Sequence, residues 1–451
     1  MTAFVLLALY ALVILGTGLI AFRRTHDSFY VNNRESGAWG VGFSIFVSCV
    51  GASATIGVIG MAFALGTPAF WWLGAGSAGL VLLSFALARK VRSSGAYTLP
   101  HMVETFLGPS VRPVISVIIV IAWMAILAAQ FSALGRVLGS MTGLSPMLCL
   151  LISLLLICGH TLGGQAAIMR IDRFQALLIL TSLAVMLAWL TQNNPGWIDS
   201  VRLEAVNTDF PPEKLLYFLI IVGANYVVCP MLFGRILSAK NERSARLGGL
   251  IGAAAIALCA ILIVSVGLAA KGLIPIDTKP DDVLTSMLGN VMPYWMNMVV
   301  SMALISAIVS SADSCLVTAS TVLSFDLLGQ LQPKTKTAAN ALRPPSFSLR
   351  REQLCVILLG LIGAALSLWG RSILGFLLMA YDIFACGVVV PVGIGLFLHK
   401  RMRFDARFIH IAVAAGGLLG LTASLTDNPL WSYIGMAVSG IMTLGGCRSH
   451  D

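Results

Sequence analysis

The chain has 451 residues, of which 58% are hydrophobic and only 11% charged, and its mean hydropathy is +0.92. Soluble domains carry about 25% charged residues, so this composition excludes a soluble globular protein despite the formal net charge of +10. An apolar run of about 20 residues crosses a bilayer. The sequence contains thirteen such runs, near residues 2–22, 38–66, 69–91, 112–139, 145–163, 174–191, 215–234, 247–270, 291–325, 352–370, 373–398, 407–425 and 429–446.

Basic residues alternate between the loops in a way that predicts the orientation of these spans. If the loop after the first span is cytoplasmic, 23 of the 29 Lys and Arg residues fall on the cytoplasmic side. We therefore expect a multi-pass protein of the cell (inner) membrane, with its N-terminus outside and its C-terminus in the cytoplasm. The nine cysteines are scattered through the spans and indicate packing rather than disulfides or a zinc site.

The second and seventh spans contain residues that break helices. The second reads GFSIFVSCVGASATIGVIGMAFALG and the seventh LIIVGANYVVCPMLFGRIL, with Gly51 and Pro230 near their centres. Interrupted helices at matching places in two inverted halves are typical of the binding site of a secondary transporter. We expect an all-α fold with a first peripheral helix, two halves of five core helices and two peripheral helices, with boundaries at 1–37, 38–191, 192–398 and 399–451.

The ninth span carries a polar seam within the sequence SAIVSSADSCLVTAS. At 100° per residue, Ala307, Ser310, Ser311, Ser314 and Thr318 fall within a sector of about 100°. Hard cations bind several oxygen ligands, some of them neutral. Two hydroxyls of this seam and the freed carbonyls of the broken second span would form such a cage for sodium, although serines in membrane helices also bond back to their own helix.

Asp313 lies about 100° away from this seam on the helical wheel. An aspartate at the centre of a membrane helix costs roughly 2.5–3.5 kcal/mol on insertion scales, so a polar partner is expected. We interpret Asp313 as a partner of a neighbouring helix or a gating residue, not as a direct ligand of the ion.

Seven motifs, in the right order from about residue 27 to 400, resemble those of the sodium:solute symporter family, which includes sodium/glucose, sodium/proline and sodium/pantothenate transporters. They read DSFYVNNRESGAWGVGFS, YTLPHMVETFLG, AAQFSALGRVL, GGQAAIMRIDRFQ, GRILSAKNERSARLG, SSADSCLVTASTVLSFDLL and AYDIFACGVVVPVGIGLF. The resemblance implies a core of five plus five inverted helices, of the type seen in the leucine transporter LeuT. It also implies sodium as the transported coupling ion and no enzymatic activity.

The resemblance also implies which residues hold the ion. The family's pattern places the sodium ligands at the carbonyls of Val47, Val50 and Ala307 and at the hydroxyls of Ser310 and Ser311. The helical wheel also favours the three of these that lie on the ninth span, Ala307, Ser310 and Ser311. Asp172 matches an acidic residue on the inward exit path of the ion.

The solute is expected near the two broken spans. Sugar-transporting members use acidic and amide side chains at positions that are apolar or small here. The pair Tyr226 and Pro230 resembles a motif of the proline permease, whereas Cys49 replaces its acidic residue. We expect a small solute with a carboxylate, either an amino acid such as proline or a short organic acid. The expected solute-binding residues are Ser48, Cys49, Ser53, Thr55, Gln130, Asn225, Tyr226 and Pro230.

Other functions remain open from the sequence. A proton-coupled or other-substrate member of the same fold would use the same scaffold. An ion channel would need a continuous polar lining, whereas only one seam and two breaks are found. An intramembrane enzyme would need a catalytic spacing that His160, Asp313 and Asp382 do not provide. We therefore predict a sodium-coupled importer that works by alternating access, with sodium, a small solute and the lipid bilayer as its partners.

Overall fold

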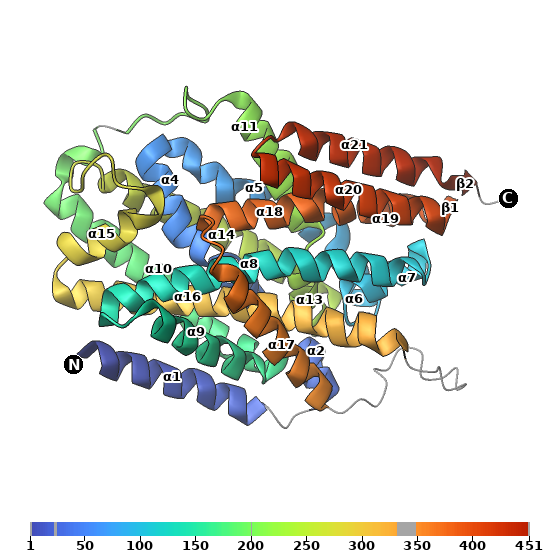
Figure 1. The fold of residues 1–451 in the computed structure, drawn as a ribbon, viewed down its shortest axis with the longest axis horizontal. Helices are drawn as coiled ribbons and strands as arrows, with labels where there is room; N and C mark the ends of the chain where they lie inside the picture. The colour runs from blue at the N-terminus through green and yellow to red at the C-terminus, as the bar shows by residue number, and fades with distance from the viewer. Residues whose placement is uncertain (1, 22–24, 200, 332–348, 450–451) are drawn as a thin grey trace.

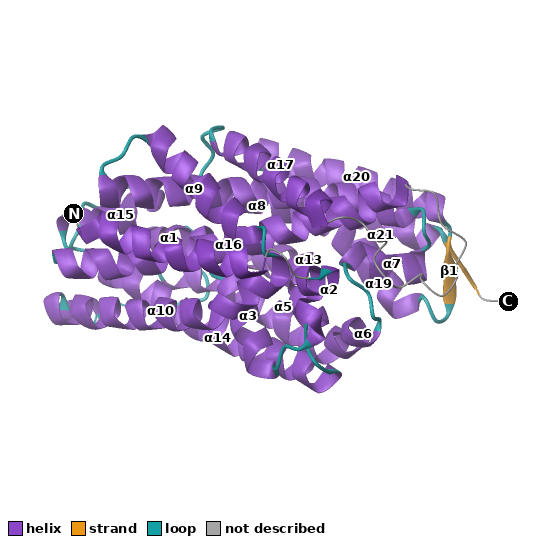
Figure 2. Cartoon of the chain, turned by 90° about the horizontal axis from the view of Figure 1, so that it is seen from below, coloured by secondary structure: helices purple, strands orange, loops and turns teal. Residues whose placement is uncertain are grey.

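The computed structural model describes residues 2–21, 25–199, 201–331 and 349–449. Several basic residues assigned to cytoplasmic loops, such as Arg23, Lys334 and Arg343, lie outside this part of the chain. The helices run roughly along the long axis of the molecule (Figures 1 and 2). In the described part the two strands of the sheet, β1 (Met402–Phe404) and β2 (Cys447–Ser449), pair antiparallel at one end. We call this the basic end, because Arg403 and Arg448 of the two strands lie there. The opposite end of the bundle is called the far end.

The described residues form an all-α bundle in which a helix or a group of helices lies at each of the thirteen predicted runs. Nine of these helices, or ten with the bent second span, are long and apolar enough to cross a membrane. Three short helices lie between spans: α2 (His26–Val31), α7 (Leu99–Leu107) and α15 (Val283–Asn290). The spans are α1 (Thr2–Ala21), α3 (Ala38–Cys49) with α4 (Val58–Leu65), α5 (Trp71–Leu82) with α6 (Ala88–Ser93), α8 (Val111–Thr142), α9 (Pro146–Thr161), α10 (Gly164–Asn193), α11 (Pro212–Tyr217) with α12 (Gly223–Val227) and α13 (Pro230–Leu237), α14 (Glu242–Ala269), α16 (Tyr294–Thr321), α17 (Leu349–Ser367), α18 (Ile373–Phe384) with α19 (Val390–Leu398), α20 (Ala406–Thr426) and α21 (Leu430–Gly445).

Both predicted breaks are confirmed. The second span bends by 64° between α3 and Ser53–Leu65, and Val50 at the bend has the non-helical angles φ −100° and ψ 70°. The seventh span leaves helical geometry at Val228 and Cys229 and restarts at Pro230. Proline has no N–H to continue the preceding helix but fits the first turn of a new one. The chain therefore exposes backbone groups at two points inside the bundle.

The second and eighth spans pack closely because glycines of each helix lie against residues of the other. A Cβ atom added to Gly248 of α14 would lie 2.6 Å from the Cβ of Val41 and 3.0 Å from the carbonyl oxygen of Ala38, both on α3. Gly252 and Gly42 make equally close approaches between the same two helices. Small residues at such contacts let helix backbones approach in a membrane. This packing holds α3 against α14 up to its break.

A buried polar cluster closes the basic end of the bundle. Arg112 at the start of α8 binds Asp326, at 2.7 Å, and Glu104 of α7, at 2.8 Å. Asp326 is fully buried and also accepts a hydrogen bond from Thr98. Tyr30 of α2 donates to the buried carboxylate of Glu352 on α17. These contacts tie the loops of the basic end to the last turns of the ninth span.

We predict that Gly248→Ala lowers thermal stability because the new methyl group overlaps α3. Overpacking of this kind costs about 1–3 kcal/mol. The matched control is Gly135→Ala on α8, where the added methyl meets nothing within 4 Å and alanine is the better helix former. The unfolding temperatures of the two purified variants in detergent should move in opposite directions. Equal temperatures would show that the α3–α14 contact is not tightly packed.

Candidate functional site

The polar seam of α16 faces the break in the second span. Ser310, Ser311 and Ser314 are all buried. The hydroxyl of Ser311 donates to backbone carbonyls at the end of α3, at 2.9 Å from the oxygen of Ser48 and 3.3 Å from that of Val47. These carbonyls belong to the last helical turn before the break, where the carbonyl groups have no N–H group of the same helix to accept from. The contact therefore joins two distant spans at the point where one of them opens.

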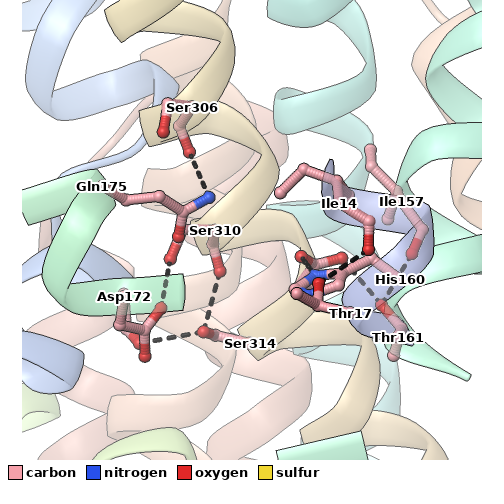
Figure 3. A network of polar contacts seen from close by, with 12 residues as sticks. Ile14, Thr17, Ile157, His160, Thr161, Asp172, Gln175, Ser306, Ser310 and Ser314 are labelled. Carbon is pink, nitrogen blue, oxygen red and sulfur yellow. Dashed lines mark hydrogen bonds and ion pairs between the residues drawn. The ribbon is translucent and has the colours of Figure 1, made fainter. Parts of the chain in front are cut away.

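On the same side, the seam continues to α10 through Asp172. The Ser310 hydroxyl donates to Asp172 Oδ1 at 3.1 Å, and Ser44 of α3 donates to the other carboxylate oxygen. Ser314 donates to the carbonyl of Ser310 at 2.8 Å. Figure 3 shows Asp172, Ser310 and Ser314 together beside α16. A buried carboxylate thus lies one hydrogen bond from a predicted ligand of the ion.

The structure brings some of the five predicted ligands of sodium together and turns one aside. Val47 and Ser311 are in direct contact, and Val50 lies at the bend of the same span. Ala307 is buried one helical turn before Ser311 on α16. Ser310 points its hydroxyl toward the carboxylate on α10 rather than toward α3. Val47, Val50 and Ser311 therefore meet at the break, whereas Ser310 is bonded to the carboxylate of Asp172.

Gly51 makes the close approach at the break possible. A Cβ atom at this position would lie 2.6 Å from the Cβ of Ser311 and 2.7 Å from Gln130 Oε1. Gln130, on α8, uses that oxygen to accept the backbone N–H of Ala52 at 3.0 Å. Gln130, expected from the sequence as a solute-binding residue, thus also braces the break: it satisfies a donor that the broken helix leaves free.

A buried arginine, Arg235 of α13, lies beside this site. Its side chain is 1% exposed, and its guanidinium donates to the hydroxyl of Ser48 at 3.1 and 3.3 Å and to that of Ser314. Ser48 and Ser314 are also 2.8 Å apart. Both broken spans and α16 therefore meet at three side chains. Asp172 is the nearby opposite charge that offsets Arg235 electrostatically.

Asp313 faces away from the seam, as predicted. Its carboxylate lies 2.5 Å from Nδ1 of His160 and accepts a hydrogen bond from Thr161 at 2.8 Å, both at the end of α9. His160 and Asp313 are buried. Figure 3 shows His160 and Thr161 on the side of α16 opposite Asp172. Asp313 is thus a partner of a neighbouring helix.

A small cavity opens beside the break, with a volume of about 40 Å³. That is space for a few waters at most, so the bundle is nearly closed around it. The lining residues come from both broken spans, α8, α16 and α18: Ser48, Cys49, Gly51, Ser53, Trp123, Ile126, Gln130, Asn225, Tyr226, Cys229, Met231, Leu232, Ser311, Cys315, Leu377 and Tyr381.

Six of the eight predicted solute-binding residues line this cavity, and two do not. Thr55 bonds back to the Gly51 carbonyl of its own span at 2.9 Å. Pro230 lines a separate small cavity toward the basic end, together with Thr98 and Gln165. The remaining six are Ser48, Cys49, Ser53, Gln130, Asn225 and Tyr226.

Several lining residues escaped the sequence analysis. Cys229 directly precedes the predicted break at Pro230, so its position offered a signal. Cys315 lies one residue beyond Ser314 of the seam. Trp123 lies in an apolar run without any local polar pattern, and only the packing of α8 against the broken spans reveals it. Tyr381 precedes Asp382 in the last of the seven motifs, but the motif alone did not indicate that its side chain lines the cavity.

Comparison with known families agrees with this geometry. The model of the sodium:solute symporter family matches residues 29–406. The chain belongs to this family. The match covers both broken spans, the seam on α16 and Asp172, and it confirms the resemblance carried by the seven motifs.

Two curated relatives are symporters. A sodium/pantothenate symporter of Haemophilus influenzae is 24% identical over 371 residues, covering 76% of this chain and 75% of that protein. An uncharacterised symporter of Cupriavidus necator is 26% identical over 198 residues, covering 41% of this chain. The chain spans only 28% of the length of that second relative.

Two solved structures share the fold. A sodium-coupled sialic acid symporter in a substrate-bound, outward-open state has a TM-score of 0.78 at 14% identity, covering 100% of this chain and 99% of that one. Mhp1, a nucleobase-cation-symport-1 transporter in a closed conformation with bromovinylhydantoin bound, has a TM-score of 0.59 at 13% identity, with 94% and 95% covered. The LeuT-type architecture predicted from the sequence is therefore confirmed.

We predict that Asp313 and Asp172 act on different properties. Asp313→Ala should lower the unfolding temperature, because removing one partner of a buried pair costs about 3–5 kcal/mol. Asp172→Asn should instead change the sodium concentration that gives half-maximal thermal stabilisation. A His160→Ala, Asp313→Ala double variant should lose less than the sum of the single losses. A shifted sodium requirement in Asp313→Ala at unchanged stability would contradict this division.

Proposed function

We propose that this protein is a sodium-coupled symporter that imports a small organic solute by alternating access. The observation that carries the proposal is the contact of Ser311 with the carbonyls of Val47 and Ser48 at the break. Sodium would insert among these oxygens and bind Val47, Val50, Ala307, Ser310 and Ser311. Family membership and the fold of a sodium-coupled neighbour support this assignment.

Coupling follows from the position of the ion between two parts of the bundle. Sodium would cross-link the end of α3 to α16 and so order the cavity beside the break. The solute would complete the cavity, and the two inverted halves, 38–191 and 192–398, would rock against each other. Each ligand must raise the affinity for the other by the same factor. Each sodium entering down about 100 mV contributes roughly 2.3 kcal/mol before its concentration gradient is counted.

Release would occur at the basic end, which we place in the cytoplasm of the cell, with the N-terminus outside. Asp172 would receive the ion as it leaves, and the hydrogen bond that it accepts from Ser310 supports this role. We infer that the solute is an amino acid or a short carboxylate. Its cavity lies beside the break and near Arg235.

Removing a hydroxyl ligand should weaken the sodium dependence of uptake. Ser310→Ala and Ser311→Ala should each raise the sodium concentration for half-maximal uptake about tenfold or more, because a lost contact to a charged group costs about 1.5–3 kcal/mol. Proteoliposomes with an imposed sodium gradient provide the measurement. The matched control is Ser320→Ala, which removes a buried hydroxyl of α16 that bonds only to Val317 of its own helix.

Unchanged sodium activation in both ligand variants would contradict the ion site. Uptake driven by a pH gradient without sodium would instead favour a proton-coupled transporter. Sodium current without solute, at a rate far above solute uptake, would favour a channel. The three outcomes can be separated in the same vesicles.

A further inference from the structure

The cavity beside the break contains a buried donor without an acceptor. Trp123 of α8 lines the cavity and is 3% exposed, and among the described residues its indole N–H has no hydrogen-bond partner. An indole N–H can only donate. Nearly all buried polar groups in native proteins are paired, so an orphan donor at a binding cavity calls for an acceptor on the ligand.

A second donor lies on the same helix, two turns further along α8. Gln130 is 2% exposed and accepts the N–H of Ala52 through Oε1. This bond fixes the orientation of the side-chain amide, so Nε2 is left with two N–H groups to donate. Gln130 also lines the cavity. Two side chains of α8 that line the cavity therefore have N–H groups left to donate.

The charges around the cavity also favour an anionic solute. The lining residues given above include neither Asp nor Glu. Arg235 is the charged side chain bonded to the lining, through the Ser48 hydroxyl at 3.1 Å. On the other side of the seam, Asp172 offsets this positive charge, and Asp313 is paired with His160. The cavity lining itself therefore provides no anionic partner for a cation.

We propose that the cavity binds a small solute whose only charge is a carboxylate, with Trp123 and Gln130 donating hydrogen bonds to its oxygens. This inference rests on the proposed function and selects one of its two solute classes. A monocarboxylate supplies the acceptors that the α8 wall lacks, and its single negative charge needs no anionic partner in the lining. The ammonium of an amino acid would be buried without an anionic partner, which is costly in a dry site. Trp123 is then a specificity-determining residue.

The test compares matched ligands on the purified full chain. Three compounds are compared for each carbon skeleton of two to seven carbons: the carboxylate, the matching α-amino acid and the neutral amide. Each is titrated with and without sodium, and the rise in unfolding temperature is measured. Cyclopentanecarboxylate and proline form one such pair, which differs by the ring nitrogen. We expect at least one carboxylate to bind, only with sodium, at least tenfold more tightly than its amino acid and amide counterparts. Equal or tighter binding of the amino acids, or no carboxylate binding, overturns the proposal.

Trp123→Phe keeps an aromatic ring and removes the N–H donor together with the five-membered half of the indole, and the control below makes the same reduction in ring size elsewhere. It should weaken binding of the best carboxylate about tenfold or more. Stabilisation by sodium alone should be unchanged. The control is Trp295→Phe at the start of α16, where the ring is 56% exposed. Unchanged carboxylate affinity in Trp123→Phe overturns the role of this residue.

Adding a negative charge to the cavity should reverse the selectivity. Cys49 lines the cavity, so Cys49→Asp places a carboxylate there, and Cys49→Ser is the uncharged control. The ratio of carboxylate to amino-acid affinity should fall at least tenfold in Cys49→Asp relative to Cys49→Ser. An unchanged ratio overturns the electrostatic basis of the proposal.

Failure of this inference can be distinguished from failure of the proposed function. Sodium alone should stabilise the wild-type protein and lose this effect in Ser311→Ala. If sodium gives no stabilisation, the ion site itself is wrong. If sodium binds as expected and amino acids are preferred over carboxylates, only the assignment of the solute class fails.

Discussion

The contact between the Ser311 hydroxyl and the last carbonyls of α3 is the interaction on which the rest of the site depends. An unsatisfied carbonyl inside a membrane protein is costly, and the break at Val50 frees several of them. Ser311 approaches them from α16 because Gly51 has no side chain to prevent it. One small residue and one hydroxyl therefore make an opened helix tolerable in the core, and the same oxygens are the natural ligands of a hard cation.

The second break has a different physical origin and a different consequence. Pro230 begins a new helix segment, so the chain leaves helical geometry at Val228 and is extended at Cys229. The restarted helix α13 carries Arg235 back into the core, where hydroxyls of the other broken span and of α16 bind it. Burial of an arginine in this way requires hydrogen bonds and a nearby opposite charge. Asp172 provides that charge and also links the arginine electrostatically to the predicted ion site.

Local patterns predicted the features that depend on one segment of chain. Glycine and proline indicated the breaks, and helical periodicity placed Ser310 and Ser311 on one face and Asp313 on another. The family motifs added Asp172. Features that depend on several spans were missed: Trp123 and Arg235 were not assigned to the site, because nothing within α8 or α13 shows which helices pack around them. Thr55 shows the opposite error. It was predicted to bind the solute because it is a polar residue of the broken span, but its hydroxyl bonds to the backbone of its own helix.

Ser48 shows how two ligands can be coupled without sharing a side chain. Its backbone carbonyl accepts a hydrogen bond from the Ser311 hydroxyl, whereas its side-chain hydroxyl accepts one from Arg235. Ser48 also lines the cavity. An ion that displaces Ser311 from this carbonyl would shift the end of α3, and the cavity wall would move with it. A solute that orders the wall would fix the same carbonyl for the ion. If both ligands act on this one element, their coupling must be reciprocal, and α3 at its break would be the element through which it passes.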